Sequence, residues 1–254
     1  MHATIIGMLL VANWKAYVET PQKAKVLFAS AKRLVGVKGM EIVLAPPAPY
    51  LGLLAAGNRS KVVFGVQDVS DSTGGAATGE VTAATAQGLG ARYAIVGHSE
   101  RRARGETDAV VLAKTQHALA TGMQPILCIG EHERDNDAQY LHFIRAQINA
   151  IFSSLTPQER LHVVVAYEPI WAIGRTAADA ISPNDLAEMI LYIRKVLGDH
   201  VPGDAAGEMR ILYGGSVEPG NARGLAGGSG IDGFLVGHAS TDAKEFSALV
   251  KAVS

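Results

Sequence analysis

The chain has 254 residues, of which 48% are hydrophobic and 19% charged, and its formal net charge is −1. This composition excludes intrinsic disorder, which requires low hydrophobicity together with high net charge. The near-zero charge argues against nucleic acid as the main partner, because binding to a phosphate backbone requires a basic face. A chain of this length forms either two small domains or one large α/β barrel.

The cysteine content and the first residues predict a cytoplasmic protein. Cys128 is the only cysteine, which excludes a disulfide framework and fits a reducing compartment. The apolar run at residues 1–12 has no basic region before it and no small-residue cleavage site after it, so it predicts a buried strand rather than a signal peptide. No apolar run approaches the roughly 18 residues that a membrane span needs, and we expect no membrane association.

Eight short apolar segments recur along the chain. Most are continuous rather than alternating, which is typical of strands buried on both faces of a parallel sheet. The segments are 8–12, 41–45, 62–66, 93–96, 125–129, 163–167, 211–213 and 233–236.

Segments with helical periodicity lie between these strands. Apolar residues recur at i, i+3 and i+4 within 24–35, 108–121 and 185–197. Thr20 and Ser182 each precede a proline, as expected of an N-cap followed by proline at the first helical position. Gly122 and Gly198 lie where a glycine commonly follows the end of a helix.

Eight strand–helix units without a linker predict a closed (β/α)8 barrel that spans residues 1–254 as a single domain. An open doubly wound sheet shows the same alternation and is the alternative. In a barrel, every strand ends at the same face, so the residues that follow the strands share one site. The polar and small residues at these positions are Asn13, Lys15, Gln67, Asp68, His98, Ser99, Glu100, Glu131, Glu168, Gly214, Gly215, Ser216, Gly237 and His238.

Three of these side chains suggest acid–base chemistry on an anion. His98 begins a helical turn, where the helix N-terminus favours a neutral imidazole that donates a hydrogen bond; the alternative is a structural histidine. Glu168 has apolar neighbours, which suits a general base; the alternative is an ion pair with arginine or lysine. Lys15 either holds an anionic substrate or lies in solvent.

The glycines after the seventh and eighth strands favour a phosphate site. Small residues let backbone N–H groups approach an anion, and the last two loops of this fold are its usual phosphate site. Ordinary turns are the alternative.

Metal and cofactor chemistry have weaker support. The charged stretch 131–135 predicts a solvated face rather than a metal site, and the sequence carries no paired-cysteine or HExxH zinc motif. Cys128 lies inside an apolar strand and is expected in the core rather than as a nucleophile. We expect neither a metal nor a cofactor.

Five blocks, in order along the chain, together resemble the triosephosphate isomerase family. They are Ala-Asn-Trp-Lys at 12–15, Gly-His-Ser-Glu-Arg-Arg at 97–102, Cys-Ile-Gly-Glu at 128–131, Ala-Tyr-Glu-Pro-Ile-Trp-Ala-Ile-Gly at 166–174 and Tyr-Gly-Gly-Ser-Val at 213–217. The resemblance implies a barrel that interconverts dihydroxyacetone phosphate and D-glyceraldehyde 3-phosphate through an enediolate without metal or cofactor. The expected partner is this phosphorylated three-carbon substrate.

The same resemblance implies the role of each catalytic residue. Glu168 matches the base that moves a proton between two carbons, and His98 matches the neutral electrophile that polarises the carbonyl. Asn13 and Lys15 match the residues that bind the substrate and stabilise its developing oxyanion, and Glu100 matches an acid beside them.

Other positions match the phosphate site, the lid and the dimer loop. Gly174, Ser216 and Gly237 match phosphate-binding positions, and His238 keeps a backbone donor next to them. Residues 169–174 resemble the start of a lid that closes over the substrate. The loop 74–80 resembles the loop of a homodimer, in which Thr78 reaches the neighbouring site.

The chain departs from the family pattern at several of these places. Arg175 and Thr176 replace the usual continuation of the lid, and Ala77 stands where an aromatic is common. His238 replaces the second glycine after the last strand, so we expect its side chain to crowd the phosphate or to require a φ that glycine adopts easily. Tyr17 stands where the family usually has asparagine.

These departures leave two further hypotheses open. One is a metal-dependent isomerase or epimerase of another phosphosugar. The other is a barrel that binds phosphorylated metabolites without isomerising them.

Overall fold

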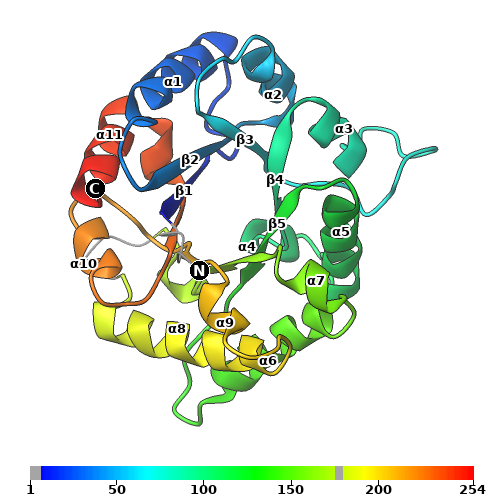
Figure 1. Cartoon of the computed structure of the whole chain (residues 1–254), viewed down its shortest axis with the longest axis vertical. Helices are drawn as coiled ribbons and strands as arrows, with labels where there is room; N and C mark the ends of the chain where they lie inside the picture. The colour runs from blue at the N-terminus through cyan, green and yellow to red at the C-terminus, as the bar shows by residue number, and fades with distance from the viewer. Residues whose placement is uncertain (1–6, 175–179) are drawn as a thin grey trace.

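Eight parallel strands pair in sequence order, and the eighth pairs with the first to close a barrel (Figure 1). The computed structural model describes residues 7–174 and 180–254, and the strand count refers to them. Closure excludes the open doubly wound sheet and confirms the predicted single-domain (β/α)8 barrel. The strands are β1 (Met8–Asn13), β2 (Met40–Ala45), β3 (Val63–Val66), β4 (Ala91–Val96), β5 (Gln124–Ile129), β6 (Val164–Tyr167), β7 (Ile211–Tyr213) and β8 (Gly233–Val236).

Helices form a ring around these strands, as Figure 1 shows. The α-helices are α1 (Pro21–Leu34), α2 (Ala48–Ala55), α3 (Ala83–Gly88), α4 (Ser99–Arg102), α5 (Asp108–Ala120), α6 (Gln139–Phe152), α7 (Pro157–Arg160), α8 (Pro183–Gly198), α9 (Ala205–Glu208), α10 (Ala222–Ala226) and α11 (Ala243–Ala252). Two 3-10 turns, η1 (Ile170–Ala172) and η3 (His238–Thr241), follow β6 and β8.

The continuous apolar character of the strands reflects two separate cores. Along β1, Leu9 and Val11 point into the barrel, where they pack with residues such as Val43 and Leu212. The alternate residue Leu10 packs outward against the helices. Burying each leucine stabilises the fold by roughly 1.5–3 kcal/mol. Neither face of a strand is left for solvent, which explains why the apolar runs are continuous rather than alternating.

Gly233 lets the barrel close. It pairs with Leu9 across the β1–β8 seam. A Cβ atom at this position would lie 1.9 Å from the carbonyl oxygen of Leu9, and the φ of Gly233 is +154°. A side chain cannot be accommodated against the backbone of the neighbouring strand, so the seam requires glycine.

Helix ends confirm three of the four predicted signals. The side chains of Thr20 and Ser182 accept hydrogen bonds from backbone N–H groups as N-caps of α1 and α8. Gly122 has a φ of +81° directly after the C-cap of α5. The prediction for Gly198 is wrong, because α8 continues through it and ends at Asp199, whose φ of −70° needs no left-handed residue.

In residues 7–174 and 180–254, none of the helices combines the length and the apolar character that a membrane crossing requires.

Candidate active site

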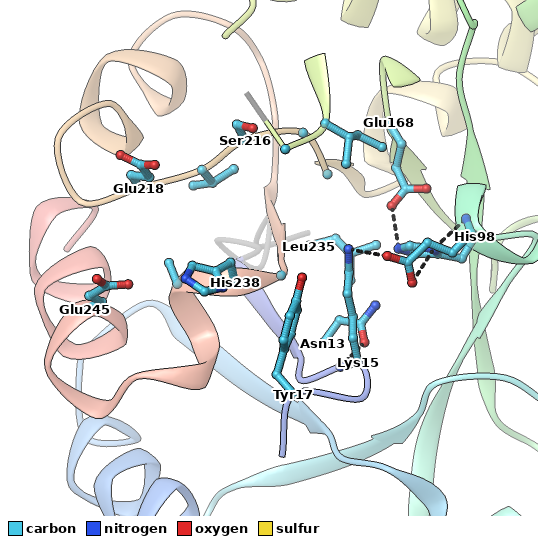
Figure 2. Close-up of a pocket in the computed structure, with 18 of the residues that line it drawn as sticks. Asn13, Lys15, Tyr17, His98, Glu168, Ser216, Glu218, Leu235, His238 and Glu245 are labelled. Carbon is cyan, nitrogen blue, oxygen red and sulfur yellow. Dashed lines mark hydrogen bonds and ion pairs between the residues drawn. The ribbon is translucent and has the colours of Figure 1, made fainter. Parts of the chain in front are cut away.

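A cavity of about 800 Å³ opens at the carboxyl ends of the strands (Figure 2). Its volume lies within the range of small-molecule sites, about 300–1,000 Å³. All nine residues predicted from the sequence to catalyse or to bind substrate line this one cavity. They are Asn13, Lys15, His98, Glu100, Glu168, Gly174, Ser216, Gly237 and His238.

Lys15 adopts an unusual backbone conformation that directs its side chain into the cavity. Its φ is +45°, in the left-handed region that costs a residue with a side chain roughly 1–3 kcal/mol. Neighbouring side chains fix this turn: the N–H of Lys15 donates to Oδ1 of Asn13 (3.0 Å), and Nε2 of Gln67 donates to the carbonyl of Lys15 (2.9 Å). The ammonium then lies 2.9 Å from Oε1 of Glu100.

The ring of His98 is held in place by contacts at both of its nitrogen atoms. It is the N-cap of α4, which confirms the predicted helical turn. Its Nδ1 accepts a hydrogen bond from the backbone N–H of Glu100 (3.2 Å), so the ring proton is on Nε2. Nε2 faces Oε1 of Glu168 at 3.2 Å. In this orientation the ring presents its Nε2 to the carboxylate of Glu168 at the cavity.

Glu168 is a buried carboxylate that follows β6. Its side chain is 3% exposed, and Oε2 accepts a hydrogen bond from the N–H of Ser99 (3.2 Å). Within the described residues, Glu168 forms no ion pair with lysine or arginine, unlike the alternative considered from the sequence. Gly214 packs against it, because a Cβ there would lie 2.8 Å from Cγ of Glu168. The carboxylate of Glu168 is therefore held at the cavity by two hydrogen-bonding contacts rather than by a cation.

The carboxyl of Glu100 stays ionised beside Lys15. Partial burial opposes its charge, but the hydrogen bond and positive charge of Lys15 outweigh burial and hold the pKa of Glu100 below its usual value. Glu100 lies between Lys15 and His98, with its Oε2 3.9 Å from Nδ1 of the histidine. The charge of Lys15 is thus partly compensated until an anion enters the cavity.

The predicted phosphate-binding residues lie along one side of the cavity. The hydroxyl of Ser216 donates to the carbonyl of Ala172 (2.9 Å), which links the loop after β7 to η1. Gly174 has a φ of +70°. Gly237 lies beside Lys15, since a Cβ on it would be 3.4 Å from Cε of the lysine. An anion between these residues would meet both backbone N–H groups and an ammonium.

His238 is accommodated in this chain without strain. Its φ is not in the positive region, so the expected conformational problem does not occur. The exposed ring lies edge-on to the ring of Tyr17, with the centroids 5.5 Å apart and the planes at 81°.

Four polar residues placed after strands by the sequence do not line this cavity: Gln67, Asp68, Ser99 and Glu131. Gln67 supports the backbone of Lys15 from outside. Asp68 accepts hydrogen bonds from the buried ammonium of Lys114. Glu131, predicted to lie on a solvated face, is buried instead, because its Oε1 accepts hydrogen bonds from Tyr167 and Trp171. His132 and Glu133 next to it are exposed as predicted.

Within the described ranges, no group of three or more His, Cys, Asp or Glu residues is arranged to hold a metal ion.

The altered lid residues Arg175 and Thr176 lie outside the described residues. Cys128 lies in the barrel core as predicted, and burial raises the pKa of its thiol well above the usual range.

Sequence reasoning missed Tyr17 as a cavity residue. Its ring is half exposed and lines the cavity next to Lys15. No motif marks it; the available signal is its position two residues beyond the predicted substrate-binding lysine, in the same loop.

Comparison with known proteins agrees with the fold and the site. The family model for triosephosphate isomerase matches residues 8–253. The triosephosphate isomerase of Symbiobacterium thermophilum is 40% identical over 249 residues, which is 97% of this chain and 96% of that protein. The Thermus thermophilus enzyme of the same name is 41% identical over 250 residues, covering 96% of this chain and 98% of the relative. The chain therefore belongs to the triosephosphate isomerase family of enzymes.

Proposed function

We propose that the protein interconverts dihydroxyacetone phosphate and D-glyceraldehyde 3-phosphate by moving a proton between adjacent carbons. The observation that carries this proposal is the meeting of Lys15, His98 and Glu168 in one cavity, with a neutral imidazole donor 3.2 Å from a buried carboxylate. A base and an electrophile within reach of one three-carbon molecule are what the reaction requires.

Glu168 is the proposed base. Its carboxylate removes a proton from the hydroxyl-bearing carbon of dihydroxyacetone phosphate, and the electron pair flows to the carbonyl oxygen to give an enediolate. The resulting carboxylic acid then returns a proton to the adjacent carbon. In the structure, both oxygens contact other groups, His98 and the N–H of Ser99. Substrate binding must release the carboxylate from these contacts before it can act.

His98 is the proposed electrophile. Its Nε2–H donates to the carbonyl oxygen and stabilises the charge that develops there. One preorganised donor of this kind typically lowers the barrier by about 2.7–4 kcal/mol. As the aldehyde forms, a proton passes from one substrate oxygen to the other through the same ring. No net proton is gained or lost over the cycle.

Lys15 and Asn13 are proposed to hold the substrate, and Lys15 also to stabilise the enediolate oxygen. The phosphate lies beside Gly174, Ser216, Gly237 and the backbone of His238. Closure of a lid that begins at η1 would exclude water, which limits side reactions of the enediolate and strengthens these electrostatic contacts.

We infer a homodimer through the loop 74–80. Figure 1 shows this segment, in cyan between β3 and α3, projecting beyond the ring of helices. Thr78 in the loop is exposed. If the neighbour's loop completes the site, activity per chain falls on dilution by mass action.

The test is isomerase activity on D-glyceraldehyde 3-phosphate at several protein concentrations. Glu168→Asp is expected to lower kcat on the order of 100-fold or more, because it moves the carboxylate by about 1 Å. The matched control is Glu133→Asp, which shortens an exposed glutamate. A native protein without isomerase activity, or a Glu168→Asp variant as fast as the control, would overturn the proposal. Addition of EDTA is expected to leave the rate unchanged; inhibition would favour the metal-dependent alternative.

A further inference from the structure

Tyr17 and His238 depart from the family pattern in loops far apart in sequence, yet their rings touch in the structure. Tyr17 lies in the loop after β1, and His238 begins η3 after β8. The edge-on contact between the rings, at a centroid distance of 5.5 Å, is a favourable aromatic geometry. The contact joins the two loops on either side of the β1–β8 seam, directly at the cavity.

The hydroxyl of Tyr17 is directed into the cavity beside Lys15, as Figure 2 shows. Within the described residues, this hydroxyl forms no hydrogen bond, although the backbone carbonyl of Tyr17 accepts one from Lys23. It therefore has its donor proton available. Gly237 lies next to the side chain of Lys15, since a Cβ on it would be 3.4 Å from Cε, so an anion that enters beside the ammonium would lie close to both Gly237 and Tyr17.

The charges that line the cavity favour the use of an uncharged donor, such as the hydroxyl of Tyr17, in binding a phosphate. Lys15 is the only lysine or arginine among the described lining residues. Four carboxylates line the same cavity, those of Glu100, Glu168, Glu218 and Glu245. A phosphate that enters must be held by one ammonium, itself shared with Glu100, and by uncharged N–H and O–H donors.

We propose that Tyr17 is a further substrate-binding residue, whose hydroxyl donates a hydrogen bond to the phosphate of the substrate. His238 is a positioning residue: its ring holds the phenol of Tyr17 in the orientation that directs the hydroxyl into the cavity. This proposal rests on the proposed function for the identity of the substrate. It does not depend on the proton-transfer mechanism.

The first experiment compares native protein with Tyr17→Phe, which keeps the ring and removes only the hydroxyl. KM for D-glyceraldehyde 3-phosphate is expected to rise about three- to tenfold, the range for one hydrogen bond, with kcat nearly unchanged. Turnover of D-glyceraldehyde, which lacks the phosphate, is expected to stay the same. An unchanged KM, or an equal loss with the unphosphorylated substrate, would overturn the role of Tyr17.

A double-mutant cycle tests the positioning role of His238. His238→Ala alone is expected to raise KM as Tyr17→Phe does, and to add nothing in the Tyr17→Phe background. His238→Phe keeps an aromatic edge against Tyr17 and is expected to restore a native KM. If the effects of His238→Ala and Tyr17→Phe multiply, or His238→Phe fails to rescue, His238 does not act through Tyr17.

Binding of inorganic phosphate separates this proposal from the catalytic one. Its dissociation constant, measured by ³¹P NMR titration, is expected to rise about three- to tenfold in Tyr17→Phe even if the protein isomerises nothing. Isomerase activity with equal phosphate affinity in native and variant protein would overturn the inference and leave the proposed function standing.

Discussion

Each end of the barrel carries a carboxylate, Glu41 at the amino end and Glu168 at the carboxyl end. The two carboxylates have different hydrogen-bond partners. At the amino end, Glu41 accepts hydrogen bonds from the hydroxyl of Tyr93 (3.0 Å) and from Arg210 (2.9 Å). At the carboxyl end, Glu168 contacts the imidazole of His98 and a backbone N–H, with no lysine or arginine paired to it among the described residues. The first arrangement pairs the carboxylate with a cation within the fold, whereas the second places a carboxylate at the cavity without a cationic partner among the described residues.

The glycines at the two ends show the same difference. Gly233 begins β8 against the backbone of Leu9, which cannot move without opening the barrel. Gly214 follows β7 and packs against the side chain of Glu168, which can move. Close packing thus serves the closure of the sheet at one end and the position of the proposed base, Glu168, at the other.

The largest expected effect is that of Gly233→Ala. The added Cβ would lie 1.9 Å from the carbonyl oxygen of Leu9. We expect a loss of more than about 4 kcal/mol in the free energy of unfolding, measured by urea denaturation. A variant of native stability would show that the seam tolerates a side chain and would contradict the proposed basis of closure.

Gly214→Ala is the matched substitution at the carboxyl end. Its Cβ would lie 2.8 Å from Cγ of Glu168 and displace that side chain. Since a misplacement near 1 Å can cost about 100-fold in rate, we expect a large drop in kcat with a melting temperature close to native. If Gly214→Ala is instead destabilised and its folded fraction has a native kcat, Gly214 serves stability as Gly233 does, and the proposed difference between the two ends is wrong.

Glu41→Gln is expected to affect stability alone. It removes the charge that Arg210 pairs with and weakens the hydrogen bond from Tyr93. We expect a loss of about 1–2 kcal/mol in unfolding free energy, with unchanged kcat and KM. A reduced kcat in the fully folded variant would mean that the amino end contributes to catalysis.

The dependence of stability on alkaline pH tests the contact between Tyr93 and Glu41 at the amino end. Burial, with the nearby charge of Glu41, raises the pKa of Tyr93 from 10.0 to about 12. The stability that protonated Tyr93 contributes is therefore complete below pH 10 and is lost as the pH rises through about 12. Unfolding free energy should fall more steeply across this range in the native protein than in Tyr93→Phe; parallel curves would refute this explanation.

The last prediction concerns the thiol of Cys128 in the barrel core, whose labelling is expected to leave the activity of the folded protein least affected. Burial, reinforced by the carboxylate of Glu168, raises the pKa of Cys128. Iodoacetamide should label Cys128 much more slowly in the folded protein than in urea, because the reactive species is the thiolate. Rapid labelling with retained activity would show that the thiol is accessible.

The fold and the residues that line the cavity were largely predictable because their signals are local. Continuous apolar runs such as 163–167 mark strands buried on both faces, and the polar residues that follow them share a face by topology. The prediction failed for Glu131, since its partners Tyr167 and Trp171 come from the next strand and turn. Tyr17 was missed for a similar reason: its contact with His238 joins opposite ends of the chain.

The most direct test of the central claim, that Glu168 moves a carbon-bound proton in the carboxyl-end cavity, is hydrogen exchange. The rate at which dihydroxyacetone phosphate acquires deuterium from D₂O can be followed by proton NMR with native protein and with Glu168→Gln. The account predicts exchange by the native protein and a rate lower by about 10²–10⁴-fold in the variant, the contribution typical of a general base. Exchange by a folded Glu168→Gln protein at the native rate would contradict it.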